Sequence, residues 1–308
     1  MLLVEGLPRA DTRTVEGATV VTIGVFDGMH RGHMALLTRL QAVASNQSAR
    51  AVVLTFRGHP DALVSGMAPA PLMTIEERLA RLAAAGVDAT YVLDFDRSLM
   101  EMTAAEFHRS VLVEGLGCVA LVFGYDAAIC RRREGTVERF RELGVAAERI
   151  DRFVHRGHAV SASAIREALT RGELEVANEM LGYAYSLTGI VEHGDARGRQ
   201  LGFATANVRI PPLCVPADGV YAVRATVRSR ALTSAPAVAN LGTRPTFAGQ
   251  GPRLEVHVLD QSPDLDLYAE PMTVDFVARI RGERRFSNEA QLADQIASDI
   301  ASARALFC

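Results

Sequence analysis

One stretch near the start of this chain combines a strand pattern, three glycines and two histidines. Residues 19–26 are mainly β-branched or apolar, as expected of a strand that is buried on both faces. Glycine occurs at positions 24, 28 and 32, where it permits tight turns and a close approach of the backbone. Residues 34–40 are typical of a helix, and His30 and His33 lie just before it. A strand, a glycine-rich turn and a helix N-terminus form an anion site to which histidines can add charge, so this stretch predicts phosphate chemistry on a nucleotide.

Length, charge and cysteine usage narrow the class of protein. With 308 residues the chain is long enough for two domains, each with its own core. The formal net charge of −3 argues against a general binder of nucleic acid or of anionic membranes. No apolar run approaches the roughly 18 residues of a membrane span, and no signal peptide is apparent. The four cysteines are scattered and form no CxxC pair, so we expect a cytoplasmic protein without a disulfide framework.

The first half of the chain alternates strand and helix patterns. Further buried strands are predicted at 51–56, 89–94 and 118–124, with helices at 74–82 and 103–112. Both helices begin with a threonine followed three residues later by glutamate, which is the spacing of a capping box. This alternation predicts a parallel sheet covered by helices, in which ligands bind at the carboxyl ends of the strands. Polar residues follow several of these strands, namely His59, Tyr125 and Asp126.

The pattern changes after a helical segment that ends near residue 181. From residue 185 the chain consists of short strand patterns separated by glycine and proline, at 186–191, 219–227, 237–240, 254–259 and 272–277. Several of them alternate between apolar and polar residues, as antiparallel strands with one solvated face do. We therefore predict a small β-barrel, followed by a terminal helix over 287–306. The predicted domains are residues 1–184 and 185–308.

Five motifs occur in an order and spacing that resemble a known family. The five lie in the second half, at residues 194–207, 219–221, 240–247, 254–257 and 280–286, and they follow the motif at 24–33 in the first half. Together they resemble the bacterial bifunctional riboflavin kinase/FMN adenylyltransferase (FAD synthetase) family. The resemblance implies an α/β chain with an N-terminal Rossmann-like nucleotidyltransferase domain built on a parallel sheet. It also implies a C-terminal small antiparallel β-barrel riboflavin kinase domain that ends in a helix.

For the C-terminal domain the resemblance implies phosphorylation of riboflavin to FMN by ATP. Glu255 matches the family's general base, which takes the proton of the ribityl 5′-hydroxyl. Thr205 and Asn207 match residues that contact the metal, and their neutral oxygens suit Mg²⁺. Ala204 replaces the family's proline, so we expect a slightly looser loop there. Nucleotide-binding glycines are expected at Gly194, Gly198 and Gly202, and Arg244 and Arg281 are either substrate-binding residues or surface charges.

For the N-terminal domain the resemblance implies adenylyl transfer from ATP to FMN, which gives FAD and pyrophosphate. His30 and His33 would stabilise the charge that develops on the phosphates, with help from the helix N-terminus and Mg²⁺. Arg166 matches a catalytic arginine of a second phosphate-binding motif. The other residues implied in this site are Gly24, Phe26, Asp27, Gly28, Ser161 and Ser163 for the nucleotide and Asp126 for the flavin substrate.

The segment 124–135 departs from the family's pattern. Ala127, Ile129 and Cys130 stand where the family has two aromatic residues and a glycine, which removes stacking surface near the flavin. A cysteine in place of glycine also disfavours a positive φ. Two alternatives to the bifunctional enzyme therefore stay open. One is a riboflavin kinase with a degenerate or repurposed nucleotidyltransferase domain, and the other is a non-catalytic flavin-sensing regulatory protein. Retention of Thr205, Asn207 and Glu255 argues against the latter.

Overall fold

A computed structural model describes all residues except 12, 194–202, 243–251, 263–264 and 308. The chain divides into two compact units. The first comprises Met1–Ala70 with Thr74–Ala162, and the second comprises Pro71–Met73 with Ser163–Cys308. The predicted boundary at residue 184 falls beyond this division, because the two helices that precede it are grouped with the second unit.

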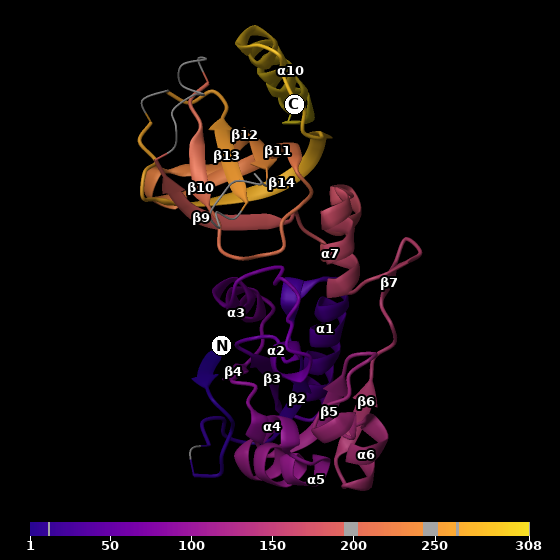
Figure 1. The fold of residues 1–308 in the computed structure, drawn as a ribbon. Coiled ribbons are helices and arrows are strands. Elements are labelled where there is room, and N and C mark those ends of the chain that lie inside the picture. The colour runs from indigo at the N-terminus through magenta and orange to yellow at the C-terminus, as the bar shows by residue number, and fades with distance from the viewer. Residues whose placement is uncertain (12, 194–202, 243–251, 263–264, 308) are drawn as a thin grey trace. The chain divides into compact units, whose positions relative to one another are not determined.

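The first unit is built on a six-stranded parallel sheet with the strand order β1-β4-β3-β2-β5-β6 (Figure 1). Every residue of β2 and β4 is buried, as the β-branched and apolar sequence of such strands predicts. The chain leaves β2 toward β3 on one side and later returns to β5 on the other, so the strand order reverses beside β2. Ligands of such sheets bind at this point, outside the carboxyl ends of the strands. The strands are β1 (Leu2–Glu5), β2 (Thr19–Ile23), β3 (Arg50–Phe56), β4 (Ala89–Leu93), β5 (Cys118–Phe123) and β6 (Ala146–Arg149).

Helices connect these strands, and both predicted capping boxes are present. The Thr74 and Thr103 side chains each accept a hydrogen bond from the backbone amide of the glutamate three residues later. The side chain of that glutamate in turn accepts one from the threonine's backbone amide. The helix predicted at 103–112 is α5 followed directly by a π-helical segment, η2. The helices are η1 (Asp27–Met29), α1 (Arg31–Asn46), α2 (Asp61–Val64), α3 (Ile75–Ala84), α4 (Arg97–Glu101), α5 (Ala104–Glu106), η2 (Phe107–Gly115), η3 (Arg131–Arg133) and α6 (Val137–Glu142). A hairpin of β7 (Val154–His155) and β8 (His158–Ala159) follows.

The second unit is a closed antiparallel barrel, in the order β10-β13-β12-β11-β14-β9, and β9 pairs with β10 to close it. Closure confirms the predicted barrel, in which each of the six described strands pairs with a neighbour on both sides. The strands are β9 (Ser186–Glu192), β10 (Ala206–Arg209), β11 (Gly219–Val227), β12 (Leu232–Gly242), β13 (Arg253–Val258) and β14 (Pro271–Arg281). The other elements are α7 (Ala162–Arg171), α8 (Leu174–Leu181), η4 (Arg228–Arg230) and α10 (Glu289–Phe307).

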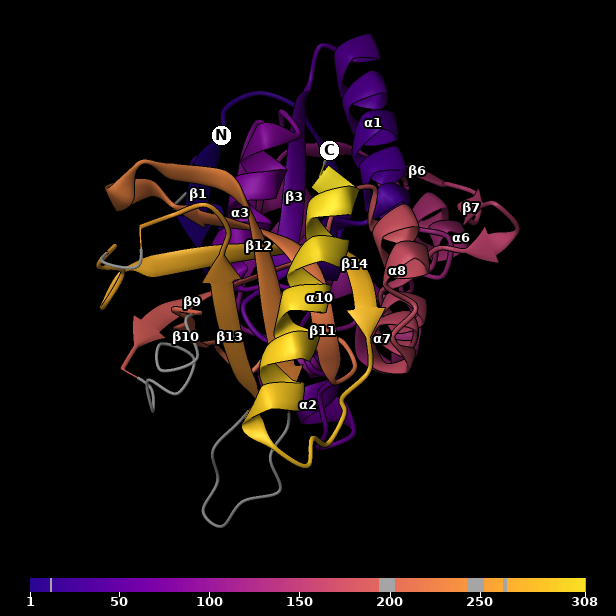
Figure 2. The same cartoon turned by 90° about the horizontal axis from the view of Figure 1, so that it is seen from above.

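Helix α10 packs along the outside of the barrel, over β11 and β12 (Figure 2). Ala303 is fully buried in this contact, in an apolar cluster with Val220, Ala222 and Val238. Asp299 is buried on the same helix, which is unusual for a carboxylate without a cationic partner. The terminal helix predicted from the sequence is therefore part of the barrel's packing.

Candidate active sites

The loop after β2 has a strained backbone that its neighbours hold in place. Phe26 and Met29 have φ values of 55° and 37°, and both side chains are buried. Such values cost about 1–3 kcal/mol per residue and persist only where the surrounding structure fixes them. The loop is fixed from β3, because the Gly24 amide donates to the Leu54 carbonyl at 3.0 Å and Thr55 Oγ1 donates to the Val25 carbonyl at 3.1 Å. This loop delivers the chain to the start of α1.

The two histidines lie together at the N-terminus of α1. His30 is the N-cap, and its Nδ1 accepts a hydrogen bond from the His33 amide at 3.2 Å. The two rings stack with centroids 3.7 Å apart and planes inclined by 12°. A Cβ at position 32 would come within 3.2 Å of the His30 ring, so glycine there permits the stacking. Since His30 Nδ1 accepts, Nε2 carries the proton of the neutral ring and is available to donate.

Burial favours the neutral form of these imidazoles, whereas the sequence suggested that they can carry charge to the site. Desolvation lowers the pKa of His30 to about 4. Desolvation also lowers the pKa of His33 well below its usual range, and the charges of His30 and Arg78 lower it further. His33 Nδ1 is buried without a hydrogen-bond partner among the described residues. At neutral pH both pKa shifts favour neutral rings, which offer a hydrogen-bond donor and acceptor at the start of α1.

The fixed positive charge comes instead from Arg78 on α3, which sequence reasoning missed. Arg78 is only 4% exposed, and its Nη1 donates to the Phe56 carbonyl at 2.7 Å and lies 3.4 Å from Thr55 Oγ1. Burial lowers its pKa, and the nearby Asp27 carboxylate opposes that shift. One sequence signal was available, since position 78 lies one helical turn before the buried Leu82 and hence on the apolar face of α3. Arg78 thus ties α3 to the end of β3 beside the strained loop.

The divergent segment after β5 packs against the core. Ala127, Ile129 and Cys130 are all partly buried against the core of the first unit. Cys130 has φ 65° and ψ 178°, a region that is essentially restricted to glycine, so the expectation that cysteine would not take a positive φ was wrong. Backbone hydrogen bonds between Ile129 and Gly135 hold this turn. Cys130 thus occupies a backbone conformation that favours glycine.

Tyr125 and Asp126 are exposed at the carboxyl end of β5. Tyr125 is 45% exposed, and the Arg152 guanidinium lies 5.2 Å from the centre of its ring. The Asp126 carbonyl accepts a hydrogen bond from Arg133 at 2.9 Å. An aromatic ring thus remains at this edge of the sheet, two residues before the first lost aromatic position.

The second phosphate-binding motif lies at the start of α7. Ser161 precedes this helix, and Ser163 and Arg166 lie within its first two turns. Ser163 is exposed and Arg166 is half-buried. Because the boundary between the two units passes through this motif, its role beside His30 stays a prediction.

In the barrel, the register of three strands aligns the residues expected for the kinase. Asn207 on β10 pairs with Glu255 on β13, which in turn pairs with Asn240 on β12. Arg253 Nε and Nη2 donate to Asn207 Oδ1 at 3.1 and 2.8 Å, and Nε lies 3.0 Å from Glu255 Oε1. The proposed base and a proposed metal ligand are therefore neighbours that share one arginine.

His257 fixes the segment that leads into β10. Its Nδ1 donates to the Ala204 carbonyl at 2.8 Å, and its ring meets Phe203 edge to face at 5.9 Å. These contacts restrain the position where alanine replaces the family's proline, next to Thr205. Four residues predicted for this site lie outside the described residues, namely Gly194, Gly198, Gly202 and Arg244.

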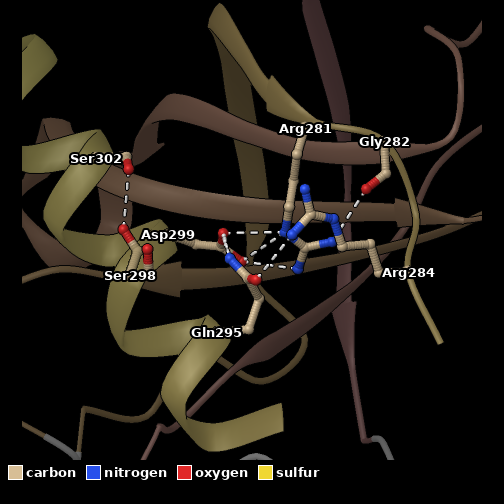
Figure 3. A network of polar contacts seen from close by, with 7 residues as sticks. All are labelled: Arg281, Gly282, Arg284, Gln295, Ser298, Asp299 and Ser302. Atoms are coloured by element: carbon tan, nitrogen blue, oxygen red, sulfur yellow. Dashed lines mark hydrogen bonds and ion pairs between the residues drawn. The ribbon is translucent and has the colours of Figure 1, made fainter. Parts of the chain in front are cut away.

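Arg281 is engaged within the protein (Figure 3). Its Nε and Nη2 donate to both carboxylate oxygens of Asp299 on α10 at 2.8–3.1 Å, and its Nη1 donates to the Gly282 carbonyl. Gln295 adds a hydrogen bond to the same carboxylate at 2.9 Å and accepts one from Arg284 at 3.2 Å. The Arg281 side chain is only 13% exposed, so the pair fastens α10 to the end of β14.

The donor set around Asn207 fits a magnesium ion bound mainly through its nucleotide. The described parts of the chain hold no group of three or more His, Cys, Asp or Glu side chains that could bind a metal ion by itself. Mg²⁺ commonly uses one or two protein oxygens together with waters and substrate phosphates, so a small donor set suffices. Asn207 Oδ1 already accepts two hydrogen bonds from a cationic group, which shows that this oxygen binds positive charge.

Comparisons with known proteins agree with both halves of this description. A family model described as FAD synthetase matches residues 12–167, and one described as riboflavin kinase matches residues 181–307. A bifunctional riboflavin kinase/FMN adenylyltransferase of Escherichia coli (strain K12) is 38% identical and aligns with 100% of this chain and 98% of its own length. A protein of the same name from Bacillus subtilis (strain 168) is 30% identical, and the alignment covers 92% of this chain and 91% of that protein.

The chain belongs to the bifunctional riboflavin kinase/FMN adenylyltransferase family.

A solved structure entitled macrolide-efflux protein from Streptococcus pneumoniae has the same architecture as this family member. It superposes with a TM-score of 0.89 at 28% identity and covers 99% of both chains. Among the described residues of the present chain, no helix has the length and apolar character needed to cross a membrane.

Proposed function

We propose that this chain phosphorylates riboflavin to FMN in its barrel unit and adenylylates FMN to FAD in its parallel-sheet unit, with ATP as the donor in both reactions. The observation that carries the proposal is the pairing of Asn207 with Glu255 across β10 and β13. This register sets the Asn207 amide, which we propose as a metal ligand, beside a carboxylate in the unit that matches the riboflavin kinase model.

In the kinase reaction Glu255 accepts the proton of the ribityl 5′-hydroxyl, while that oxygen bonds to the γ-phosphorus of ATP and the bond to ADP breaks. Glu255 is about one-third exposed at the barrel surface, so a substrate hydroxyl can reach it. Thr205 and Asn207 would hold Mg²⁺, which neutralises charge on the phosphates. His257 positions the chain just before Thr205 through its bond to Ala204.

In the adenylyl transfer an oxygen of the FMN phosphate bonds to the α-phosphorus of ATP, and pyrophosphate leaves. The amides at the N-terminus of α1 and the neutral His30 Nε2–H donate to the phosphate oxygens where charge develops. Arg78 supplies a buried positive charge that needs no reorganisation during the reaction. Tyr125 offers an exposed ring for stacking against the flavin or the adenine, which supports an active unit in spite of the changes at 127–130.

The substrates implied are riboflavin, FMN and ATP, with FMN and FAD as products. We expect neither nucleic acid nor membrane among the partners. The described cysteines, Cys118, Cys130 and Cys214, form no disulfide, which supports a reducing compartment such as the cytoplasm.

Chromatography of the flavins tests the assignment of the two reactions. The purified chain is incubated with ATP and Mg²⁺, with either riboflavin or FMN as the acceptor. We expect FMN and FAD from riboflavin, and FAD from FMN. Glu255→Ala should abolish FMN formation and spare FAD formation from FMN, whereas His30→Ala should have the opposite effect.

Each contrary result has a distinct meaning. FMN without FAD would leave a riboflavin kinase with a repurposed first unit. Absence of any product would overturn both enzyme assignments. Loss of both reactions in either single variant would contradict two independent sites.

A further inference from the structure

Arg253 contacts two oxygen groups that the kinase reaction requires. Its guanidinium donates two hydrogen bonds to Asn207 Oδ1 and lies 3.0 Å from Glu255 Oε1. Arg253 and Glu255 are two residues apart on β13 and so share one face of the strand. Both side chains are about one-third exposed, which places this cluster at the accessible surface of the barrel.

While Arg253 makes this contact, the metal ion and the substrate cannot bind the same oxygen atoms. A carboxamide oxygen has two lone pairs, and the Nε and Nη2 groups of Arg253 occupy both on Asn207. Neither a magnesium ion nor a hydroxyl donor can take that oxygen while the guanidinium stays. One of the two Glu255 carboxylate oxygens, Oε1, also lies 3.0 Å from Arg253 Nε. The guanidinium must therefore move before the reaction.

The chemistry of the incoming nucleotide indicates where the guanidinium goes. A transferring phosphoryl group spreads negative charge over three oxygens, and catalysis depends on cations placed around them. The planar fork of arginine matches two phosphate oxygens at once. Arg253 projects from the same strand face as Glu255, so it is beside the hydroxyl that attacks the phosphorus.

We propose that Arg253 is a catalytic residue of the riboflavin kinase reaction. In the structure its guanidinium rests on Asn207 and Glu255, and on nucleotide binding it transfers to the phosphoryl group that moves to riboflavin. The inference rests on the roles proposed above for Asn207 and Glu255. It adds that one residue both pairs with the Glu255 carboxylate and stabilises the transition state.

Two substitutions separate the charge of Arg253 from its fork geometry. Arg253→Gln keeps a hydrogen-bond donor without charge, and Arg253→Lys keeps the charge without the fork. Arg209→Gln is the matched control, because it removes an arginine from β10 whose ion pair with Glu192 is exposed. The full chain is used throughout, and FAD formation from FMN in the other unit reports on the integrity of each preparation.

We expect Arg253→Gln to lower kcat for FMN formation by about 100-fold, as loss of a single oxyanion donor does, with little change in the KM for riboflavin. Arg253→Lys should retain an intermediate kcat. Calorimetry supplies a readout apart from activity, since Mn²⁺ without nucleotide should bind the Gln variant more tightly than the unaltered chain because its competitor for Asn207 is gone. Arg209→Gln should match the unaltered chain in each measurement.

A kcat for Arg253→Gln equal to that of Arg209→Gln would overturn the proposal, whatever the affinity for Mn²⁺. An unchanged Mn²⁺ affinity of Arg253→Gln would contradict the competition between Arg253 and the metal ion for Asn207 Oδ1. If Arg253→Gln unfolds, the Lys variant decides alone, and a kcat equal to that of the unaltered chain would refute a role for the fork. Full activity of Glu255→Ala would instead remove the proposed base and leave the Arg253 measurements interpretable.

Discussion

Substitution of Asp299 by alanine tests how α10 is held on the barrel. Asp299 is buried and accepts three contacts from Arg281 at 2.8–3.1 Å and one from Gln295 at 2.9 Å. Removal of the carboxylate leaves the Arg281 guanidinium without its anion in a position that is 13% exposed. Only the Gly282 carbonyl then remains among the partners described above for this guanidinium.

The expected cost follows from this burial. Breaking a buried ion pair by removing one partner costs about 3–5 kcal/mol, and we take the lower limit because Arg281 retains some contact with solvent. The barrel unit has roughly 150 residues, so its unfolding entropy converts about 3 kcal/mol into a decrease of about 10 °C in Tm. Asp299→Ala should therefore lower the calorimetric transition of the barrel unit by that amount.

A second ion pair of the same helix provides the control. Arg304 and Asp260 also join α10 to the barrel, but both side chains are exposed, so Asp260→Ala should cost less than about 1 kcal/mol. The double variant Arg281→Met with Asp299→Leu should recover most of the loss, since it leaves no unpaired charge. Equal effects of Asp299→Ala and Asp260→Ala in scanning calorimetry would refute the reasoning, as would a double variant no more stable than Asp299→Ala.

Two further predictions concern the first unit. The pKa of His30 is about 4 in the folded protein and about 6.5 in the unfolded chain. The contribution of the neutral ring to the free energy of unfolding is therefore fully present above pH 6.5 and is lost as the pH falls toward 4. His30→Asn removes the titrating ring but keeps a capping oxygen. Between pH 7 and 5, the free energy of unfolding measured in urea should therefore fall by about 2 kcal/mol less in this variant than in the unaltered chain. An equal fall in both would contradict the burial of a neutral ring. Arg78→Met should lower FAD formation, spare FMN formation and destabilise the first unit by about 1–3 kcal/mol, because the Phe56 carbonyl loses its donor. Arg50→Met, at the exposed opposite end of β3, should change neither reaction, and equal effects of the two variants would remove the special role of Arg78.

The amino-acid sequence by itself determined the class of both folds and the family. Local signals located four of the six strands of the parallel sheet, because these are apolar, largely β-branched runs, and they located helices that begin with capping boxes such as that at Thr74. The short outer strands β1 and β6 were not predicted. The motif at 24–33 located the turn before α1 because its glycines and histidines are close neighbours in the sequence, so their effect on the backbone is local. The four-residue strand β10 was missed, because its sequence is short and carries little strand preference without its partners.

Only the tertiary structure decided the charge states and partners of the site residues. Burial lowers the pKa of His30 and His33 and so favours their neutral forms, and Arg78 brings positive charge from a helix distant in sequence. Arg281 is held by Asp299, and Arg253 lies on Asn207, 46 positions away. Burial and pairing between distant segments set whether an ionisable group is charged and what it binds, and a linear sequence contains neither until the chain has folded.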